Sequence, residues 1–166
     1  MNESDKNRIR RMKILALDPA TKCGWAHSCG TSGTFDLRVK KDESSGMRLI
    51  RLEGKLDEIK ESVGVDLVVF EAQRGGLPGR MGALVVQAEI QGVLKRWCEA
   101  SKIEYRGYSP GEIKKHATGK GNSGKDEMMA AAEIRWPGKK FVDDNEVDAL
   151  FLLDLAQQEY GGVESC

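Results

Sequence analysis

The chain has no excess of charge of either sign and no long apolar run. Its 26 Lys and Arg residues balance 26 Asp and Glu residues, so a polyanion could be bound only by a local cluster of basic side chains. No stretch approaches the roughly 18 consecutive apolar residues of a membrane-spanning helix, and the polar N-terminus lacks the apolar core of a signal peptide. We therefore expect a soluble, cytoplasmic protein without membrane contacts.

Histidine and cysteine are also scarce. The four cysteines lack the paired spacing of a zinc site, and neither of the two histidines completes a set of four ligands. This pattern excludes a structural zinc centre and indicates reduced thiols. The residues concerned are Cys23, Cys29, Cys98, Cys166, His27 and His116.

The length of the chain suits one domain. A chain of 166 residues can bury a sizeable core but leaves little room for a second one. Residues 1–11 have no apolar period and contain three arginines, which indicates a flexible basic arm or an extension before the fold. We expect a single domain over residues 12–160 and a tail over residues 161–166.

The first part of the domain has the pattern of three strands. Residues 13–18 (KILALD) are typical of a buried strand, and residues 23–28 and 33–39 are short strands separated by glycine-rich turns. This spacing predicts a three-stranded antiparallel meander.

Helices then alternate with two more strands. Residues 46–64 have a helical period that ends at Gly64, and the nearly continuous apolar run over residues 65–71 predicts a strand covered on both faces. The remaining expected elements are a helix over residues 82–101, a strand over residues 103–108, and helices that begin at Ser109, Ser123 and Asp144. The pattern predicts an α/β fold with a mixed five-stranded sheet, three strands antiparallel and two parallel, flanked by helices.

Two carboxylates each follow a buried strand. Asp18 ends the run ILALD, and Glu71 ends the run LVVFE. The C-terminal ends of neighbouring parallel strands share one edge of a sheet, where open α/β sheets bind ligands. Taken singly, Asp18 could cap the turn with Pro19, and Glu71 could mark the exit of its strand into solvent. Taken together, they predict paired carboxylates at one edge of the sheet.

The last predicted helix carries further acidic side chains. Asp144 and Asp148 share a helical face at a spacing of four residues, and Asn145 and Asp148 share it at a spacing of three. Asp148 precedes the apolar run ALFLL, so its charge needs a partner, and no Lys or Arg in this segment supplies one. A cation from outside the chain is the natural partner, and carboxylate oxygens suit Mg²⁺ or Mn²⁺. Two such ions, roughly 4 Å apart, could activate a water for phosphodiester hydrolysis.

A basic segment lies between the acidic ones. It combines a predicted helix start with a glycine-rich loop whose backbone amides can face phosphate. Two arginines in the loop after Glu71 could extend the same surface. An ordinary solvated helix face is the alternative, but carboxylates able to bind metal nearby favour nucleic-acid binding. The lysines of the segment are Lys114, Lys115, Lys120 and Lys125, and the arginines are Arg74 and Arg80.

Four stretches of the chain resemble, in order and spacing, the RuvC-type Holliday-junction resolvases of the ribonuclease H-like fold. They are ILALDPATKCGWA, VVFEAQ, YSPGEIKKHATGKGNSGK and NEVDALFLL. The match runs from about residue 13 to residue 157. Many ribonuclease H-like proteins share the first two stretches, whereas the third is much more specific.

The resemblance implies a site and an activity. Asp18, Glu71 and Asp148 fall on the family's metal-binding carboxylates, and Lys114 and Lys125 fall on lysines that serve DNA binding and catalysis. The resemblance also implies a homodimer, joined through the helix over residues 82–101, that cuts a four-way DNA junction symmetrically. Such an enzyme would use two Mg²⁺ ions, with Mn²⁺ as a substitute.

The chain departs from the bacterial members of this family at two positions. They usually carry Asp or His where this chain has Asn145, so we assign the fourth metal ligand to Asp144, with Asn145 as the alternative. They also carry an aromatic residue that wedges into the junction where this chain has Arg74. These departures are typical of a divergent or phage-type member.

Other functions stay open at this point. A related ribonuclease H-like nuclease would act on RNA or on other branched DNA. A non-catalytic junction-binding protein would follow if Asn145 disables the site. The stretch LALDPATKCGWA also suggests an actin-like ATPase, but a chain of this length lacks room for the second half of that fold.

Overall fold

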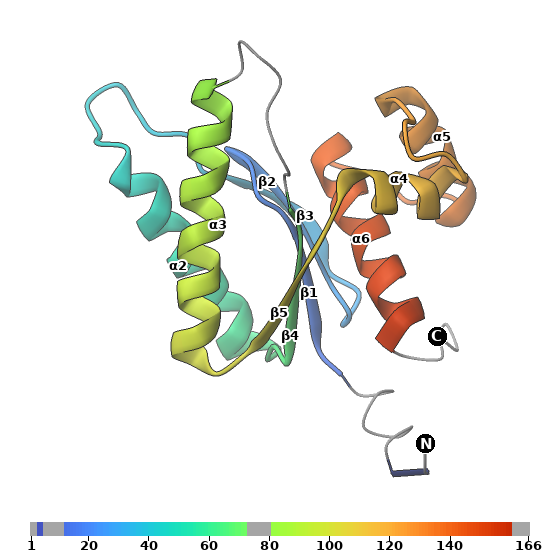
Figure 1. Cartoon of the computed structure of the whole chain (residues 1–166), viewed down its shortest axis with the longest axis horizontal. Coiled ribbons are helices and arrows are strands. Elements are labelled where there is room, and N and C mark those ends of the chain that lie inside the picture. Colours follow the sequence, from blue (N-terminus) through green and yellow to red (C-terminus); the bar gives the residue numbers. More distant parts are fainter. Residues whose placement is uncertain (1–2, 5–11, 73–80, 161–166) are drawn as a thin grey trace.

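A mixed sheet forms the centre of the molecule, and helices cover both of its faces (Figure 1). The computed structural model describes residues 3–4, 12–72 and 81–160. The strands are β1 (Ile14–Asp18), β2 (Lys22–His27), β3 (Ser32–Asp36), β4 (Leu67–Glu71) and β5 (Glu104–Tyr108). They lie in the order β3-β2-β1-β4-β5, with β1, β2 and β3 antiparallel and β1, β4 and β5 parallel. The predicted fold class is confirmed.

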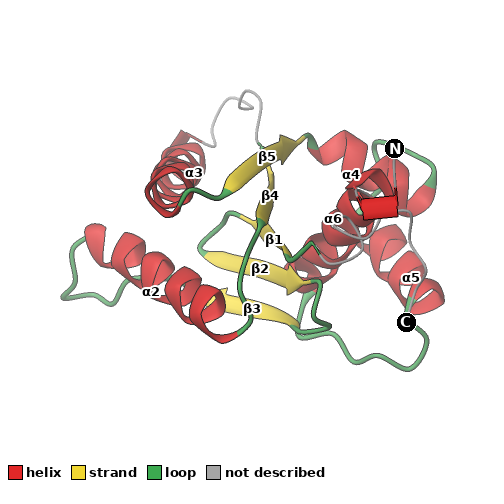
Figure 2. Ribbon diagram, turned by 90° about the horizontal axis from the view of Figure 1, so that it is seen from below, coloured by secondary structure: helices red, strands yellow, loops and turns green. Residues whose placement is uncertain are grey.

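The described helices divide between the two faces of the sheet. In Figure 2, α2 and α3 lie on one face, and α4, α5 and α6 lie on the other. Their bounds are α2 (Gly46–Ser62), α3 (Met81–Ser101), α4 (Pro110–Thr118), α5 (Lys125–Arg135) and α6 (Asp144–Tyr160). None of these helices is long and apolar enough to cross a membrane.

Successive side chains of each strand point to opposite faces of the sheet, so the sheet separates two apolar cores. Ile14 and Ala16 of β1 pack in the core that contains α6, whereas Leu15 and Leu17 pack in the core that contains α2 and α3. The same alternation places the next residue, Asp18, on the α6 face of the sheet.

Helix α6 is apolar on most of its circumference because other elements surround it. It packs on β1, β2 and β4 and against α4 and α5. A helix enclosed in this way needs apolar side chains on more than one stripe, which explains its nearly continuous apolar run. Its buried apolar residues are Val147, Ala149, Leu150, Phe151, Leu152, Leu153 and Ala156.

Local side-chain chemistry sets the ends of the elements. Helix α4 begins with a capping box, in which Ser109 Oγ accepts from the Glu112 N–H and the Glu112 carboxylate accepts from the Ser109 N–H. Strand β3 ends at Asp36, before the predicted end at residue 39. Beyond the strand, the Asp36 carboxylate accepts hydrogen bonds from the backbone N–H and the side chain of Arg38.

The chain ends fall largely outside the described residues. Of the predicted arm over residues 1–11, only residues 3–4 are described, and the predicted tail over residues 161–166 is not. The described cysteines, Cys23, Cys29 and Cys98, are free thiols, as predicted.

The beginning of α6 lies directly on β2 at Gly24. A Cβ atom added to Gly24 would lie 1.9 Å from the backbone carbonyl oxygen of Asn145. No side chain fits so close a contact, so the glycine sets the distance between the beginning of α6 and the sheet.

Gly24→Ala should therefore destabilise the fold by about 2–4 kcal/mol, because the backbone of α6 must move away from the sheet. Gly54→Ala in α2 is the matched control, since a Cβ there meets no atom within 4 Å. It should stabilise the protein by up to about 1 kcal/mol. Chemical denaturation measures both effects, and an unchanged free energy of unfolding for Gly24→Ala would contradict the contact.

Candidate active site

A row of paired residues crosses the sheet at the end of β1. In the antiparallel ladders Asp18 pairs with Gly24, and Gly24 pairs with Thr34. On the parallel side, Asp18 and Glu71 each follow the last residue pair between β1 and β4, and Glu71 pairs with Tyr108 of β5. Asp18 and Glu71 therefore lie at the same edge of the sheet, as the sequence predicts.

The acidic residues at the beginning of α6 act on Asp18. Burial raises the pKa of Asp18 well above its usual value. Nearby negative charges raise it further, and they belong to Glu71, Asp148, Asp144 and Asp143. An aspartate that caps a turn accepts amide hydrogen bonds, which lower its pKa, so the turn-cap interpretation of Asp18 is disfavoured. We call Asp18, Glu71, Asp144 and Asp148 the acidic cluster.

Asp148 is subject to the same repulsion. Its pKa is raised to about 7, first by burial and then by the charges of Glu71 and Asp144. Lys114 and Lys125 oppose this shift. The pKa of Glu71 is also raised by burial, with Lys114 acting in the opposite direction. The acidic cluster thus concentrates negative charge that the two lysines neutralise only in part.

Lys125 forms an ion pair with Asp144 of the acidic cluster. Its Nζ atom lies 2.5 Å from Asp144 Oδ2, while the lysine side chain stays 83% exposed. The sequence pattern points to a cation from outside the chain as the partner of this helix. The structure adds an internal one, because α5 packs along α6 and begins at Lys125.

The acidic cluster is not a preformed coordination shell. In the part of the chain that the structure describes, no group of three or more His, Cys, Asp or Glu side chains is arranged to hold a metal ion. The donor chemistry nevertheless fits a hard divalent cation, because all four donors are carboxylates and their mutual repulsion falls when positive charge is added. Their role as metal ligands stays a prediction.

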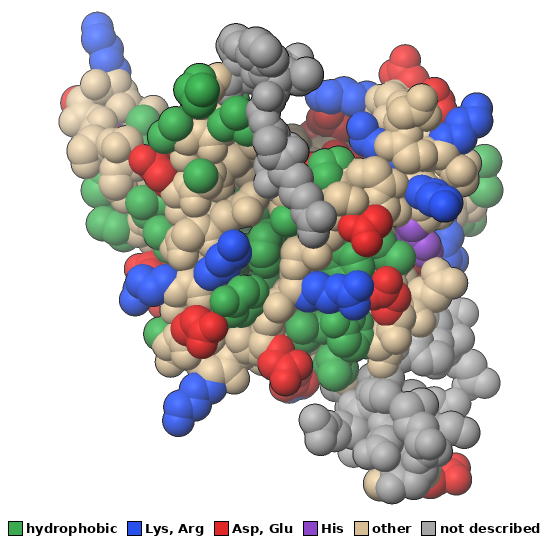
Figure 3. Space-filling model, viewed as in Figure 1, with side chains coloured by type: hydrophobic (Ala, Val, Ile, Leu, Met, Phe, Trp, Pro, Cys, Tyr) green, Lys and Arg blue, Asp and Glu red, His purple; other side chains and the backbone are tan. Residues whose placement is uncertain are grey.

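The predicted basic residues differ in their distance from the acidic cluster. Lys114 is half-buried and close enough to lower the pKa values of Glu71 and Asp148. Lys115 and Lys120 are exposed. Figure 3 shows Lys and Arg side chains gathered over α4 and α5, at the upper right of the view. The other predicted DNA-binding residues lie outside the described part of the chain, and these are Arg74 and Arg80.

Hydrogen bonds hold together the loop between α4 and α5. Thr118 Oγ1 and Ser123 Oγ lie 2.5 Å apart, and Ser123 donates to the carbonyl oxygen of Lys120 at 3.1 Å. Ser123 is only 1% exposed and belongs to this loop, so α5 begins at Lys125 and not at Ser123 as predicted. The loop therefore determines where Lys125 lies.

Two acidic residues that are not among the predicted site residues organise the beginning of α6. Asp143 caps the helix, since its Oδ1 accepts from the N–H of Glu146 at 3.0 Å. Glu146 is 2% exposed and accepts from the N–H of Val142 at 2.5 Å. The Asp-x-x-Glu spacing of a capping box is the signal that could have found them.

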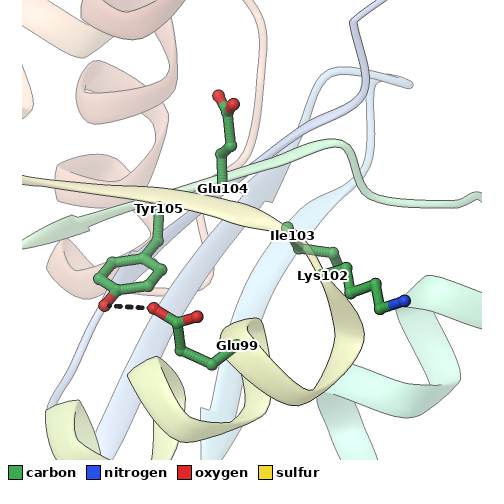
Figure 4. A pocket seen from close by; sticks show the side chains of 5 residues that line it. All are labelled: Glu99, Lys102, Ile103, Glu104 and Tyr105. Carbon is green, nitrogen blue, oxygen red and sulfur yellow. Dashed lines mark hydrogen bonds between the residues drawn. The ribbon is translucent and has the colours of Figure 1, made fainter.

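An open hollow on the surface lies away from the acidic cluster (Figure 4). Its lining residues are Glu99, Lys102, Ile103, Glu104 and Tyr105. Tyr105 Oη donates to Glu99 Oε1 at 3.1 Å. The hollow adjoins the beginning of β5, whereas the end of β5 pairs with Glu71, so the hollow does not contribute to the candidate site.

The chain resembles a known bacterial nuclease over most of its length. It is 35% identical over 146 residues to the crossover junction endodeoxyribonuclease RuvC of Brachyspira hyodysenteriae, which covers 84% of this chain and 89% of that protein. No family model matches the chain.

Solved structures share the fold. Thermus thermophilus RuvC in complex with a Holliday junction substrate has a TM-score of 0.71 at 15% identity, covering 90% of this chain and 98% of that chain. The yeast mitochondrial Holliday junction resolvase has a TM-score of 0.60 at 12% identity, covering 95% of this chain and 86% of that chain.

Asp148→Asn should stabilise the metal-free protein at neutral pH. With the pKa of Asp148 at about 7 in the folded state and 3.8 as its ordinary value, the charged form costs the fold up to about 4 kcal/mol above pH 7. A raised pKa in the folded state favours folding at low pH, and this advantage is lost as the pH rises from about 4 to about 7. The stabilisation by Asp148→Asn should therefore grow over that range, as denaturation in the presence of chelator would measure.

Asp42→Asn is the control for this prediction because Asp42 is exposed and remote in sequence from the acidic cluster. Its free energy of unfolding should match that of the wild type. An Asp148→Asn protein less stable than the wild type at neutral pH would show that the charge of Asp148 is well compensated in the fold.

Proposed function

The chain belongs to the RuvC family of crossover junction endodeoxyribonucleases, and we propose that it resolves four-way DNA junctions by hydrolysing phosphodiester bonds. The acidic cluster on the α6 face of the sheet, with Lys114 and Lys125 acting on it, is the observation that carries this proposal. Carboxylates that can bind divalent cations, placed beside lysines that can contact phosphate, suit this reaction.

The four residues of the acidic cluster would hold two Mg²⁺ ions, with Mn²⁺ as a substitute. When bound, such ions activate a water and stabilise the leaving oxygen of the phosphodiester. The chain's own contribution is a set of partly buried carboxylates whose repulsion favours cation binding. We propose Asp144 ahead of Asn145 as the fourth ligand, because the charge of Asp144 acts on both Asp18 and Asp148.

The lysines are proposed to bind DNA at different distances from the reacting phosphate. Lys125 is exposed and already paired with a carboxylate, so it can exchange Asp144 for a phosphate oxygen when DNA arrives. Lys114 lies deeper and balances the charge of Glu71 and Asp148. The remaining proposed DNA contacts are Lys115, Lys120, Arg74 and Arg80.

We further propose a homodimer joined through α3, which corresponds to the helix expected over residues 82–101. The second half of α3 packs on the sheet through Leu94 and Trp97. Over residues 81–89 no side chain is fully buried, and Met81 and Val85 are 72% and 50% exposed. A second copy of the chain could pack on this exposed apolar stretch. The two-fold symmetry of such a dimer would match the nearly two-fold symmetry of a four-way junction.

Asp18→Asn should abolish junction cleavage in Mg²⁺, because the amide removes a charge that the cation needs. We expect the cleavage rate to fall at least about 100-fold, while junction binding in chelator persists. Asp42→Asn should cut as the wild type does. The assay follows a labelled four-way junction beside a linear duplex and an RNA–DNA hybrid of the same sequence, in Mg²⁺, in Mn²⁺ and in chelator.

Each outcome of this assay assigns the protein to a class. Paired symmetric nicks on the junction alone support the proposal. Equal cleavage of linear duplex or of an RNA–DNA hybrid would indicate another ribonuclease H-like nuclease. Binding without nicks in Mg²⁺ and Mn²⁺ would indicate a junction-binding protein. An Asp18→Asn protein that cuts at the wild-type rate would contradict the assignment of the site.

Lys125→Ala should slow the cleavage step itself, whereas Lys115→Ala should weaken binding alone. Each substitution removes one proposed phosphate contact, so each should reduce the salt dependence of binding by about one unit in log–log slope. Of these two lysines, Lys125 pairs with Asp144 of the acidic cluster, so Lys125→Ala should lower the single-turnover rate of bound junction by about tenfold or more, whereas Lys115→Ala should not. Equal single-turnover rates for the two variants would contradict this difference.

A further inference from the structure

Two hydroxyl groups of the edge strand β3 hold the beginning of α6. Thr34 Oγ1 donates to Asp143 Oδ1 at 2.7 Å, and Ser32 Oγ donates to Glu146 Oε1 at 2.7 Å. Ser32 and Thr34 are two positions apart on the strand, so both side chains lie on the same face of the sheet. The strand thus holds the beginning of α6 through two hydrogen bonds.

Both acceptors also belong to the cap of α6. Asp143 Oδ1 accepts from the Glu146 N–H at 3.0 Å, and Glu146 Oε2 accepts from the Val142 N–H at 2.5 Å. The buried Glu146 carboxylate also lies 3.8 Å from Lys139 Nζ. The hydroxyl groups of β3 therefore bind a connected network, and a buried carboxylate that loses a partner is costly to the structure.

Strand β2 makes the third contact with the same turn. Gly24 lies against the Asn145 carbonyl oxygen and pairs in the ladders with both Thr34 and Asp18. The first turn of α6 therefore lies over a row of three neighbouring residues, Thr34, Gly24 and Asp18. One end of the row binds the helix cap, and the other end belongs to the acidic cluster.

These contacts determine where the carboxylates of α6 lie relative to Asp18. Asp144 follows the anchored Asp143 directly, and Asp148 lies one helical turn further. Because the backbone of a helix is stiff, a shift of its first turn moves both carboxylates together. A displacement of about 1 Å from productive geometry can reduce a reaction rate about 100-fold.

We propose that Thr34 and Ser32 are positioning residues, which hold the first turn of α6 where Asp144 and Asp148 meet Asp18. They act through Asp143 and Glu146. The inference rests on the proposed function, since it concerns the geometry of the same site.

The test compares Thr34→Val, which keeps the shape of the side chain but removes the hydroxyl, with Thr34→Ser, which keeps the hydroxyl. Thr34→Val should lower the single-turnover cleavage rate of a bound four-way junction about tenfold. It should also raise the Mg²⁺ concentration needed for half-maximal rate. Junction affinity in chelator should not change, and Thr34→Ser should restore the wild-type rate and Mg²⁺ dependence.

Tyr108→Phe is the matched control because it removes a hydroxyl that holds the other end of the same helix. Tyr108 Oη donates to Glu159 Oε2 at 2.6 Å. The variant should lose stability but keep the wild-type Mg²⁺ dependence, which separates placement of the carboxylates from general loosening of α6. Ser32→Ala is the second test variant and should show the same lowered rate and raised Mg²⁺ requirement. It keeps the test available if Thr34→Val does not fold.

Two results would overturn the inference. One is a wild-type rate and Mg²⁺ dependence in the folded test variants. The other is a lowered cleavage rate and a raised Mg²⁺ requirement in Tyr108→Phe. That result would show that the general stability of α6, and not the position of its carboxylates, determines both quantities. A wild-type protein that cuts no junction would instead overturn the proposed function, and this inference with it.

Discussion

Repulsion among partly buried carboxylates is the constraint on which the rest of this structure depends. Burial raises the pKa values of Asp18, Glu71 and Asp148, and the charges of Glu71 and Asp144 raise those of Asp18 and Asp148 further. Lys125 forms an ion pair with Asp144. Such an arrangement costs stability, which the apolar packing of α6 between the sheet and α4 and α5 offsets. The repulsion that strains the isolated chain is also what makes a divalent cation a favourable partner.

Hydrogen bonding distinguishes the acidic residues that support the site from those that form it. Burial alone would raise the pKa of Asp143, but hydrogen bonds from Thr34 and from residues 145 and 146 hold that pKa below its usual value. Asp148, five residues further along the chain, lacks comparable compensation, and its pKa rises to about 7. Asp143 and Asp148, close together in the chain, thus acquire different pKa values from their different partners.

Periodicity in the sequence predicts the fold and much of the site. The apolar runs ending in Asp18 and Glu71 define parallel strands whose ends share an edge, and the helix that carries Asp148 begins where predicted. Local patterns do not predict contacts between distant segments. Thr34 and Asp143 are 109 positions apart, and the approach of Lys125 to Asp144 depends on how α5 packs on α6. The cap of α6 has a local signal in the Asp-x-x-Glu spacing of Asp143 and Glu146, which overlaps the acidic pattern of Asp144 and Asp148.

A divalent cation bound at the acidic cluster should stabilise the fold. The most direct test is the change in thermal unfolding midpoint of the full chain when Mg²⁺ replaces chelator, measured for the wild type and for Asp18→Asn. Mg²⁺ should raise the midpoint of the wild type by several degrees, roughly 2–4 °C for each kcal/mol of binding free energy, and leave that of Asp18→Asn nearly unchanged. Equal shifts in the two proteins, or no shift in the wild type, would contradict divalent-cation binding at the acidic cluster.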